Sequence, residues 1–168
     1  MTFDASPWGA GGFLAVDGTI TSWFATSFTE EDESAVGVTF GASSAQQVAE
    51  ALAVLFGMRV WLPHWIELAP QIHVRSDSVA ALSMVTRMQT SSPQLSFVAR
   101  ELALTLSRSC IRPVVVEHTP GVCNKLADAL SRRYQPGVSW QVPAALRHVT
   151  EVSVCRPGSY YRTSAHPR

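Results

Sequence analysis

Four acidic residues stand where their immediate neighbours give no reason for a charge. Asp4 directly precedes a run of small residues, and Glu50 lies in an almost continuously apolar stretch with no Lys or Arg at positions 46, 47, 53 or 54. Asp77 follows a short β-rich run, and Asp128 lies near the end of the last predicted helix. Carboxylates that lie close together raise one another's pKa unless a cation neutralises them, and oxygen-only ligands favour Mg²⁺ or Mn²⁺ over zinc. If the fold brings the four residues together, they can form a divalent-metal site.

Each acid also has a simpler explanation when it is taken alone. Asp4 can form an Asx turn, bonding the backbone two residues further on. Asp77 can cap the next helix, and Asp128 can pair with Arg132 at the i,i+4 spacing. Glu50 can be an ordinary solvated helix residue, although its apolar surroundings favour a buried or cleft position. Together, the four residues form a more specific constellation than any one of them.

The elements that must position these residues follow from local patterns. Asp17-Gly18 is a strong hairpin turn, and Ser43 or Ser44 is a candidate N-cap for the long apolar helix. The segment 27–41 has no clear period, so a further strand and an exposed loop are both open interpretations. We predict strands over 3–6, 11–16, 19–24, 71–76 and 113–118, and helices over 45–62, from 77 to 85 or 88, over 93–110 and over 124–132.

This order of elements predicts the fold class. Three antiparallel strands followed by βα units predict a mixed sheet with helices packed over it, which is an α/β fold. We place this domain at residues 1–133. Beyond it, proline and glycine interrupt the chain, and four Arg against one acid make residues 134–168 mildly basic. We therefore expect residues 134–168 to form a tail or linker.

Composition and charge bound the class of protein. The chain has 168 residues, 46 % of them apolar and 15 % charged, which predicts one folded domain and not a disordered polypeptide. A formal net charge of zero argues against a strongly basic nucleic-acid binder, yet residues 1–58 hold seven acids and no Lys or Arg, and all thirteen basic residues follow. Three cysteines without a CxxC pair disfavour a disulfide framework and a zinc site, so we expect a reduced, intracellular protein. No apolar run reaches the length of a membrane span, and we expect no membrane partner.

Four blocks of sequence occur in unbroken order between residues 2 and 133. They are Thr-Phe-Asp-Ala-Ser-Pro-Trp-Gly-Ala-Gly-Gly (2–12), Gln-Gln-Val-Ala-Glu-Ala-Leu-Ala-Val-Leu (46–55), Val-Arg-Ser-Asp-Ser-Val-Ala-Ala-Leu (74–82) and His-Thr-Pro-Gly-Val-Cys-Asn-Lys-Leu-Ala-Asp-Ala-Leu-Ser-Arg (118–132). Together they resemble the ribonuclease H family, most closely the RNase H domain of retroelement reverse transcriptases of the LTR or DIRS-like type. The resemblance implies an RNase H-like fold: a mixed five-stranded sheet, with three antiparallel strands and then parallel strands, and helices on both faces.

The resemblance also implies a role for each acid. Four carboxylates of that family bind two Mg²⁺ ions, with Mn²⁺ as an alternative, and here they would be Asp4, Glu50, Asp77 and Asp128. Asp4 would bridge both ions, and Asp128 would complete the site of the ion that activates water. Glu50 and Asp77 would hold the ion on the leaving-group side. His118 would assist proton transfer or product release, and its alternative is a histidine in the core or on the sheet face.

The implied reaction is hydrolysis of the RNA strand of an RNA/DNA hybrid during reverse transcription. The implied partner is an upstream polymerase domain of the same polyprotein, and we expect no small-molecule cofactor. Only three residues precede Asp4, so we expect the chain to begin inside a longer polyprotein. The glycines can equally be packing positions, the glutamines first-turn residues, and Asn124 a residue that positions Asp128 or caps its helix. The expected substrate contacts are Ser6, Gly11, Gln46, Gln47, Ser78 and Asn124.

Related enzymes and a non-enzymatic protein are the rival interpretations. Transposase and integrase domains generally lack the first-helix acid, and proofreading exonucleases carry Asp-x-Glu on the first strand, where this chain has Asp4-Ala5-Ser6. The alternative from another class is a non-catalytic module, decayed or structural, that binds nucleic acid or connects polyprotein domains. Residues 88–93 carry no cluster of Arg and Lys, so we expect metal-dependent hybrid binding that is weak outside a larger protein.

Overall fold

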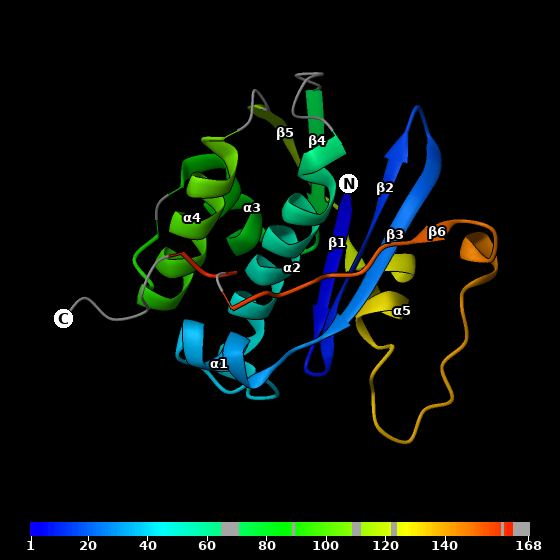
Figure 1. Ribbon diagram of the computed structural model, residues 1–168, viewed down its shortest axis with the longest axis horizontal. Coiled ribbons are helices and arrows are strands. Elements are labelled where there is room, and N and C mark those ends of the chain that lie inside the picture. The colour runs from blue at the N-terminus through cyan, green and yellow to red at the C-terminus, as the bar shows by residue number, and fades with distance from the viewer. Residues whose placement is uncertain (65–70, 89, 109–111, 122–123, 159, 163–168) are drawn as a thin grey trace.

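A six-stranded mixed sheet organises the protein, whose computed structural model describes residues 1–64, 71–88, 90–108, 112–121, 124–158 and 160–162. Its strand order is β5-β4-β1-β2-β3-β6 (Figure 1). The first three strands are antiparallel, β4 and β5 add in parallel beside β1, and β6 adds in parallel beside β3. Their bounds are β1 Thr2–Ser6, β2 Gly9–Val16, β3 Thr19–Ser27, β4 Gln71–Ser76, β5 Arg112–His118 and β6 Thr150–Glu151. The predicted α/β fold is confirmed, and β6 adds a sixth strand to the five predicted.

Helices cover both faces of this sheet. They are α1 Glu30–Val36, α2 Gln46–Trp61, α3 Val79–Arg87, α4 Pro93–Leu106 and α5 Lys125–Ser131. Helices α2, α3 and α4 lie on one side of the sheet and α5 on the other (Figure 1). The alternation along β1 shows why, because successive strand residues point to opposite faces. Phe3 packs against Trp61 of α2, whereas the next residue, Asp4, contacts Ser131 of α5.

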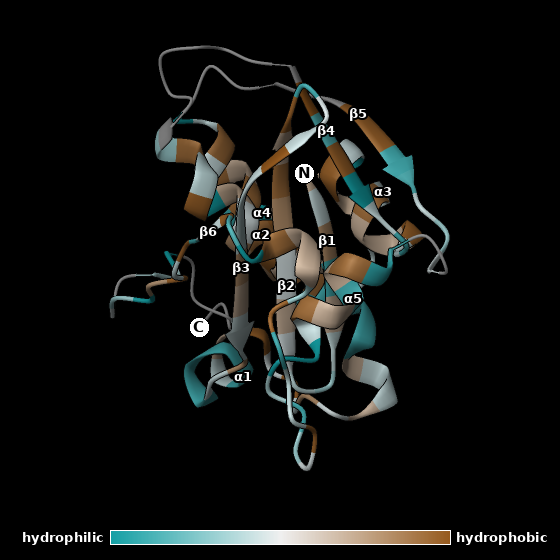
Figure 2. Ribbon diagram, turned by 90° about the vertical axis from the view of Figure 1, so that its right-hand side faces the viewer, coloured by the Kyte–Doolittle hydropathy of each residue, from teal (hydrophilic) through white to brown (hydrophobic). Residues whose placement is uncertain are grey.

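Helix α2 is the central helix of the apolar core, as its almost continuous apolar sequence predicts. It is brown along most of its length in Figure 2, and Leu52, Leu55 and Phe56 are fully buried. A short 3-10 turn, Ser43–Ala45, leads into it, and its N-cap Ala45 makes no capping side-chain bond. The predicted serine cap is therefore wrong, because the serines belong to the preceding turn. The remaining predicted helices begin and end within a few residues of the prediction.

The segment that had no clear period contains helix α1. Thr29 caps it by accepting a hydrogen bond from the Asp32 backbone, and the Asp32 side chain accepts one from the Thr29 backbone. This reciprocal capping box satisfies two backbone donors at the helix start. Gly37, in the left-handed conformation at φ 70°, ends the helix. Both sequence interpretations, a strand and a loop, are therefore wrong for residues 30–36.

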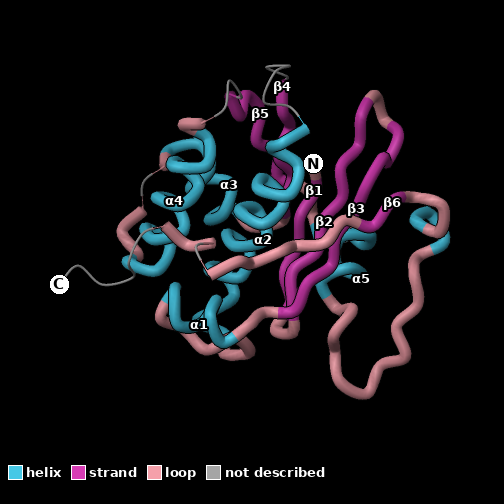
Figure 3. Tube along the Cα trace, in the orientation of Figure 1, coloured by secondary structure: helices cyan, strands magenta, loops and turns pink. Residues whose placement is uncertain are grey.

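Residues beyond Arg133, expected to form a tail or linker, pack on both sides of the sheet. Trp140 and Leu146 join Trp23 and Leu130 in a small core beside α5. After β6, residues 152–162 cross over α2 toward α4 (Figures 1 and 3), and we call this segment the C-terminal strap.

Buried ion pairs hold the C-terminal strap. Arg156 lies 3.1 Å from the Asp32 carboxylate, and its guanidinium also lies over the Phe56 ring. Tyr161 donates its hydroxyl hydrogen to the same Asp32. Arg59 forms a 2.6 Å ion pair with the fully buried Glu101. The segment thus covers charges that would otherwise lie in an apolar interior.

Two further expectations concern the cellular setting. Within the described part of the chain, no helix is long and apolar enough to cross a membrane. Cys155 is a free, exposed thiol. The other two cysteines, Cys110 and Cys123, lie outside the described residues.

Candidate metal centre

Three acids from three separate elements converge at one end of the central strands. Asp4 lies in the middle of β1, Asp77 directly follows the last residue of β4, and Glu50 lies in the second turn of α2. One carboxylate oxygen from each residue can be chosen so that all lie within 4.8 Å of one another. Asp4 and Glu50 are buried, whereas Asp77 is half-buried. We call Asp4, Glu50 and Asp77 the acidic cluster.

The simpler explanations for two of these acids do not hold in the structure. Ser78, and not Asp77, is the N-cap of α3, since its hydroxyl accepts a hydrogen bond from the Ala81 backbone. Asp4 does not form an Asx turn with Ser6, because its oxygens accept hydrogen bonds from the side chains of Ser131 and Asn124 instead. Both carboxylates therefore remain directed at the cluster and not at a local turn or cap.

Burial and mutual repulsion disfavour the charged forms of the cluster. Burial raises the pKa of Asp4 to about 7, with the charges of Asp77 and Asp128 adding to the rise and the Ser131 hydrogen bond opposing it. Burial, followed by the charges of Asp4 and Asp77, raises the pKa of Glu50 to about 9. A cation is needed to keep such carboxylates ionised near neutral pH.

The cluster fits a hard divalent cation. Gln46 donates to Oε1 of Glu50, whereas Oε2 of this buried carboxylate has no hydrogen-bond partner among the described residues. A buried, unpaired carboxylate oxygen is costly unless an ion or water satisfies it. The donors are oxygen atoms alone, which suits Mg²⁺ or Mn²⁺. The residues present thus match the metal that the sequence predicts.

Asp128 lies outside the acidic cluster formed by the described residues. Its Oδ1 accepts a 2.7 Å hydrogen bond from Nε of Arg132, and both side chains are about half exposed. The simpler explanation, an i,i+4 ion pair on the surface of α5, is therefore present. Asp128 still lies near enough for its charge to raise the pKa of Asp4.

His118 ends β5 beside the cluster. It is exposed, so it is not the core histidine that was its alternative. Its Nε2 lies 3.1 Å from the carbonyl oxygen of Asp77. A carbonyl only accepts, so this contact indicates a hydrogen on Nε2 and leaves Nδ1 as the proton acceptor of the neutral ring. The polar ends of β4 and β5 are teal in Figure 2.

Most of the expected substrate contacts make internal contacts in the structure. Ser6 donates to the Ser131 carbonyl, and Gln46 donates to Glu50 and to the Ala5 carbonyl. Ser78 caps α3, as described above. Gly11 is a close-packing position, because a Cβ there would lie 2.4 Å from Leu130 Cβ. Gln47 is exposed on the first turn of α2.

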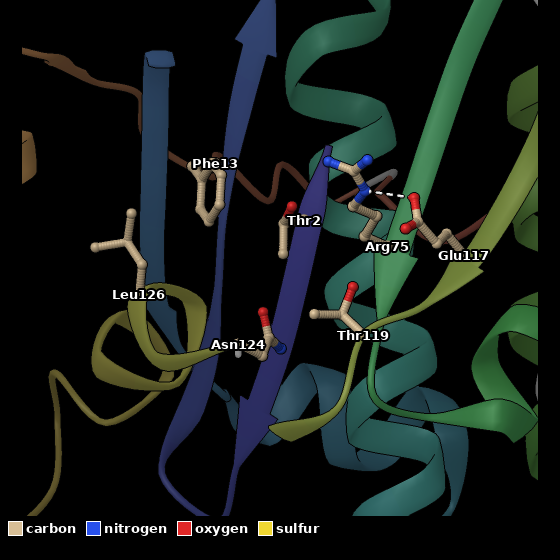
Figure 4. A pocket seen from close by; sticks show the side chains of 7 residues that line it. All are labelled: Thr2, Phe13, Arg75, Glu117, Thr119, Asn124 and Leu126. Atoms are coloured by element: carbon tan, nitrogen blue, oxygen red, sulfur yellow. Dashed lines mark hydrogen bonds and ion pairs between the residues drawn. The ribbon is translucent and has the colours of Figure 1, made fainter. Parts of the chain in front are cut away.

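Asn124 joins the cluster to a neighbouring cavity of about 270 Å³. Its Nδ2 donates to the Phe3 carbonyl at 3.0 Å and lies 3.4 Å from Oδ1 of Asp4, so it positions Asp4 rather than Asp128. It makes no capping bond for α5. Figure 4 shows the cavity, with the Arg75–Glu117 ion pair on its far side. The lining residues are Thr2, Phe13, Arg75, Glu117, Thr119, Asn124 and Leu126.

Ser131 is a contact of the cluster that sequence reasoning missed. Its hydroxyl lies 2.6 Å from Oδ2 of Asp4, and the residue is fully buried. A sequence signal exists, since Ser131 follows Asp128 by three residues and so shares its helix face.

Comparisons with known proteins agree with this arrangement. A family model described as reverse transcriptase-like matches residues 28–134. The chain belongs to the reverse transcriptase-like family. The match includes Glu50, Asp77, His118 and Asp128, and Asp4 precedes it.

A solved structure has the same fold. RNase H1 from the halophilic archaeon Halobacterium salinarum NRC-1 is similar at a TM-score of 0.61 and 19 % sequence identity, over 82 % of this chain and 96 % of the other. At this identity the likeness concerns the fold, and the reverse transcriptase-like chain is an RNase H-like domain. No curated protein shows significant sequence similarity to this chain.

Proposed function

We propose that this protein hydrolyses the RNA strand of RNA/DNA hybrids with the help of two divalent ions, as part of the reverse transcription of a retroelement. The observation that carries the proposal is the acidic cluster, in which Asp4, Glu50 and Asp77 converge with an unpaired oxygen on Glu50. The fold and the reverse transcriptase-like family support the substrate class. An intracellular location and an upstream polymerase domain in the same polyprotein are parts of the same proposal.

The chain's own residues divide the work. Asp4, Glu50 and Asp77 would hold Mg²⁺ or Mn²⁺, with Asp128 completing the site after it leaves Arg132. When bound, two such ions supply an activated water and stabilise the leaving oxygen of a phosphodiester. His118 would take up or deliver a proton at Nδ1, because its Nε2 is held by the Asp77 carbonyl. The hybrid itself would be recognised by its wide minor groove and by the 2′-hydroxyls of one strand.

The test is cleavage of a labelled RNA/DNA hybrid with Mg²⁺ by the wild type and by Asp77→Asn. We expect the wild type to cut the hybrid and to leave single-stranded RNA and duplex DNA intact, and the variant to lose nearly all activity. Asp17→Asn is the matched control, since Asp17 is an exposed acid in the β2–β3 turn, outside the cluster. Equal cleavage by the wild type and Asp77→Asn would refute the role of the cluster. No cleavage by any of them would favour the non-catalytic module.

A further inference from the structure

The Ser131 hydroxyl meets the Asp4 carboxylate inside the protein. Besides its 2.6 Å contact with Oδ2 of Asp4, the Ser131 Oγ lies 2.9 Å from the Asp128 carbonyl oxygen. A serine hydroxyl has one hydrogen to donate. The shorter contact assigns that hydrogen to Asp4, because bonds from a hydroxyl to a carboxylate are about 2.5–2.7 Å long. Ser131 therefore donates a charge-assisted hydrogen bond to the ionised form of Asp4.

Ser131 gives Asp4 its tightest side-chain contact. The other side-chain donor, Nδ2 of Asn124, lies 3.4 Å from Oδ1, which is the long end of hydrogen-bond distances. The two donors stand at opposite ends of α5, so one helix holds both oxygens of the carboxylate. The Ser131 contact is the shorter by 0.8 Å and constrains the orientation of Asp4 more strongly.

Ser131 is itself fixed in place by packing. Its carbonyl accepts a 2.7 Å hydrogen bond from Oγ of Ser6 on β1. Gly11 stands opposite Asp4 in the β1–β2 register, and a Cβ at Gly11 would lie 2.6 Å from the Ser131 nitrogen. The end of α5 can approach the sheet this closely because Gly11 has no side chain. A buried donor fixed by backbone contacts holds its partner in one orientation.

We propose that Ser131 is a positioning residue that orients Asp4 for divalent-metal binding. This inference rests on the proposed function, because it takes Asp4 as a metal ligand. Removal of a hydrogen-bond partner that orients a metal ligand typically weakens metal binding about 10- to 100-fold. Ser131 is thus a determinant of metal affinity although it need not touch the metal.

The test measures Mn²⁺ binding to the full chain by calorimetry, without nucleic acid. We expect Ser131→Ala to weaken Mn²⁺ binding about 10- to 100-fold. Ser131→Thr keeps the hydroxyl and should bind Mn²⁺ close to the wild-type value. Ser22→Ala is the matched control, because Ser22 is also buried and its hydroxyl accepts a bond from Trp61 outside the cluster. The control should keep wild-type Mn²⁺ affinity whatever it does to the melting temperature.

Several outcomes would overturn the proposal. Wild-type Mn²⁺ affinity in a folded Ser131→Ala variant would do so, and so would a Ser22→Ala variant that loses as much affinity. Hybrid cleavage measured in parallel keeps this inference separate from the proposed function. A wild type that binds Mn²⁺ without cutting the hybrid refutes the proposed function, while the binding constants still decide the role of Ser131. A wild type that cuts the hybrid, with an unchanged Mg²⁺ requirement in Ser131→Ala, refutes the role of Ser131 alone.

Discussion

Gln46 donates a 2.8 Å hydrogen bond to Oε1 of Glu50, one turn further along α2, while Oε2 of Glu50 has no partner among the described residues. Glu50 is therefore only half satisfied in a site where burial, together with Asp4 and Asp77, raises its pKa to about 9. The metal-free protein should pay for this arrangement as the carboxylate ionises.

The stability of the metal-free protein should fall as the pH rises. Glu50 ionises near pH 4.5 in the unfolded chain and near pH 9 in the folded protein, and Asp4 near 3.8 and 7. The folded state then holds protons that the unfolded state has released, so its stability is greatest below about pH 4 and is lost up to about pH 9. The slope is at most about 1.4 kcal/mol per pH unit for each group.

Glu50→Gln isolates the part that belongs to Glu50. Because the amide does not ionise, we expect the variant to lose less stability than the wild type between pH 7 and 9. The measurement is urea unfolding in EDTA at a series of pH values. Burial lowers the pKa of the Met1 amino group to about 6, which acts in the opposite sense but equally in both proteins. Parallel curves for the two proteins would contradict this prediction.

The C-terminal strap should be necessary for stability. Arg156→Ala leaves Asp32, which is fully buried, without its 3.1 Å cationic partner. Loss of one partner of a buried ion pair costs about 3–5 kcal/mol. Arg75→Ala is the control, since the Arg75–Glu117 pair is about half exposed and should contribute at most about 1 kcal/mol. Chemical unfolding measures both, and equal losses would argue against a structural role for the strap.

Local sequence patterns predicted the strands and the helices from α2 onward because their signals lie within each segment. Helix α2 is buried on all sides and reads as apolar throughout, and β-branched residues mark β5. Helix α1 was missed although Thr29 and Asp32 form a capping box three residues apart. Its apolar residues are too few to show a helical period.

The C-terminal strap was not predictable from local patterns. Its contacts are single residues whose partners lie far away in sequence, such as Arg156 with Asp32 and Arg59 with the Tyr160 carbonyl. Pro and Gly in this part of the chain are typical of linkers, and no periodic apolar pattern opposes that interpretation.

The candidate site was predictable where an acid had no local partner. Glu50 was expected to be buried because no cation lies at helical spacing, and it is 4 % exposed. Ser131 was missed because a serine at the end of a helix carries no charge and no unusual spacing. Its contact with Asp4 depends on how closely α5 approaches β2, which only the tertiary structure shows.

Arg132 should compete with a divalent ion for Asp128. Its guanidinium bonds Oδ1 of Asp128 at 2.7 Å, so a cation must displace it to use that carboxylate. We expect Arg132→Ala to strengthen Mn²⁺ binding by up to about fivefold, since an exposed ion pair contributes about 0.2–1 kcal/mol. Arg132→Lys keeps the charge and should stay closer to the wild type. Weaker Mn²⁺ binding by Arg132→Ala in calorimetry would contradict this competition.

Gly11→Ala should separate α5 from the sheet. A Cβ at Gly11 would lie 2.4 Å from Leu130 Cβ and 2.6 Å from the Ser131 nitrogen, so α5 must move. Overpacking of this kind costs about 1–3 kcal/mol, measured by chemical unfolding. Because the displaced Ser131 no longer reaches Asp4, Mn²⁺ affinity should fall together with stability. Gly158→Ala is the control, since a Cβ there meets nothing within 4 Å, and it should change neither quantity. A Gly11→Ala variant that loses stability but keeps wild-type Mn²⁺ affinity would show that the approach of α5 does not set the metal site.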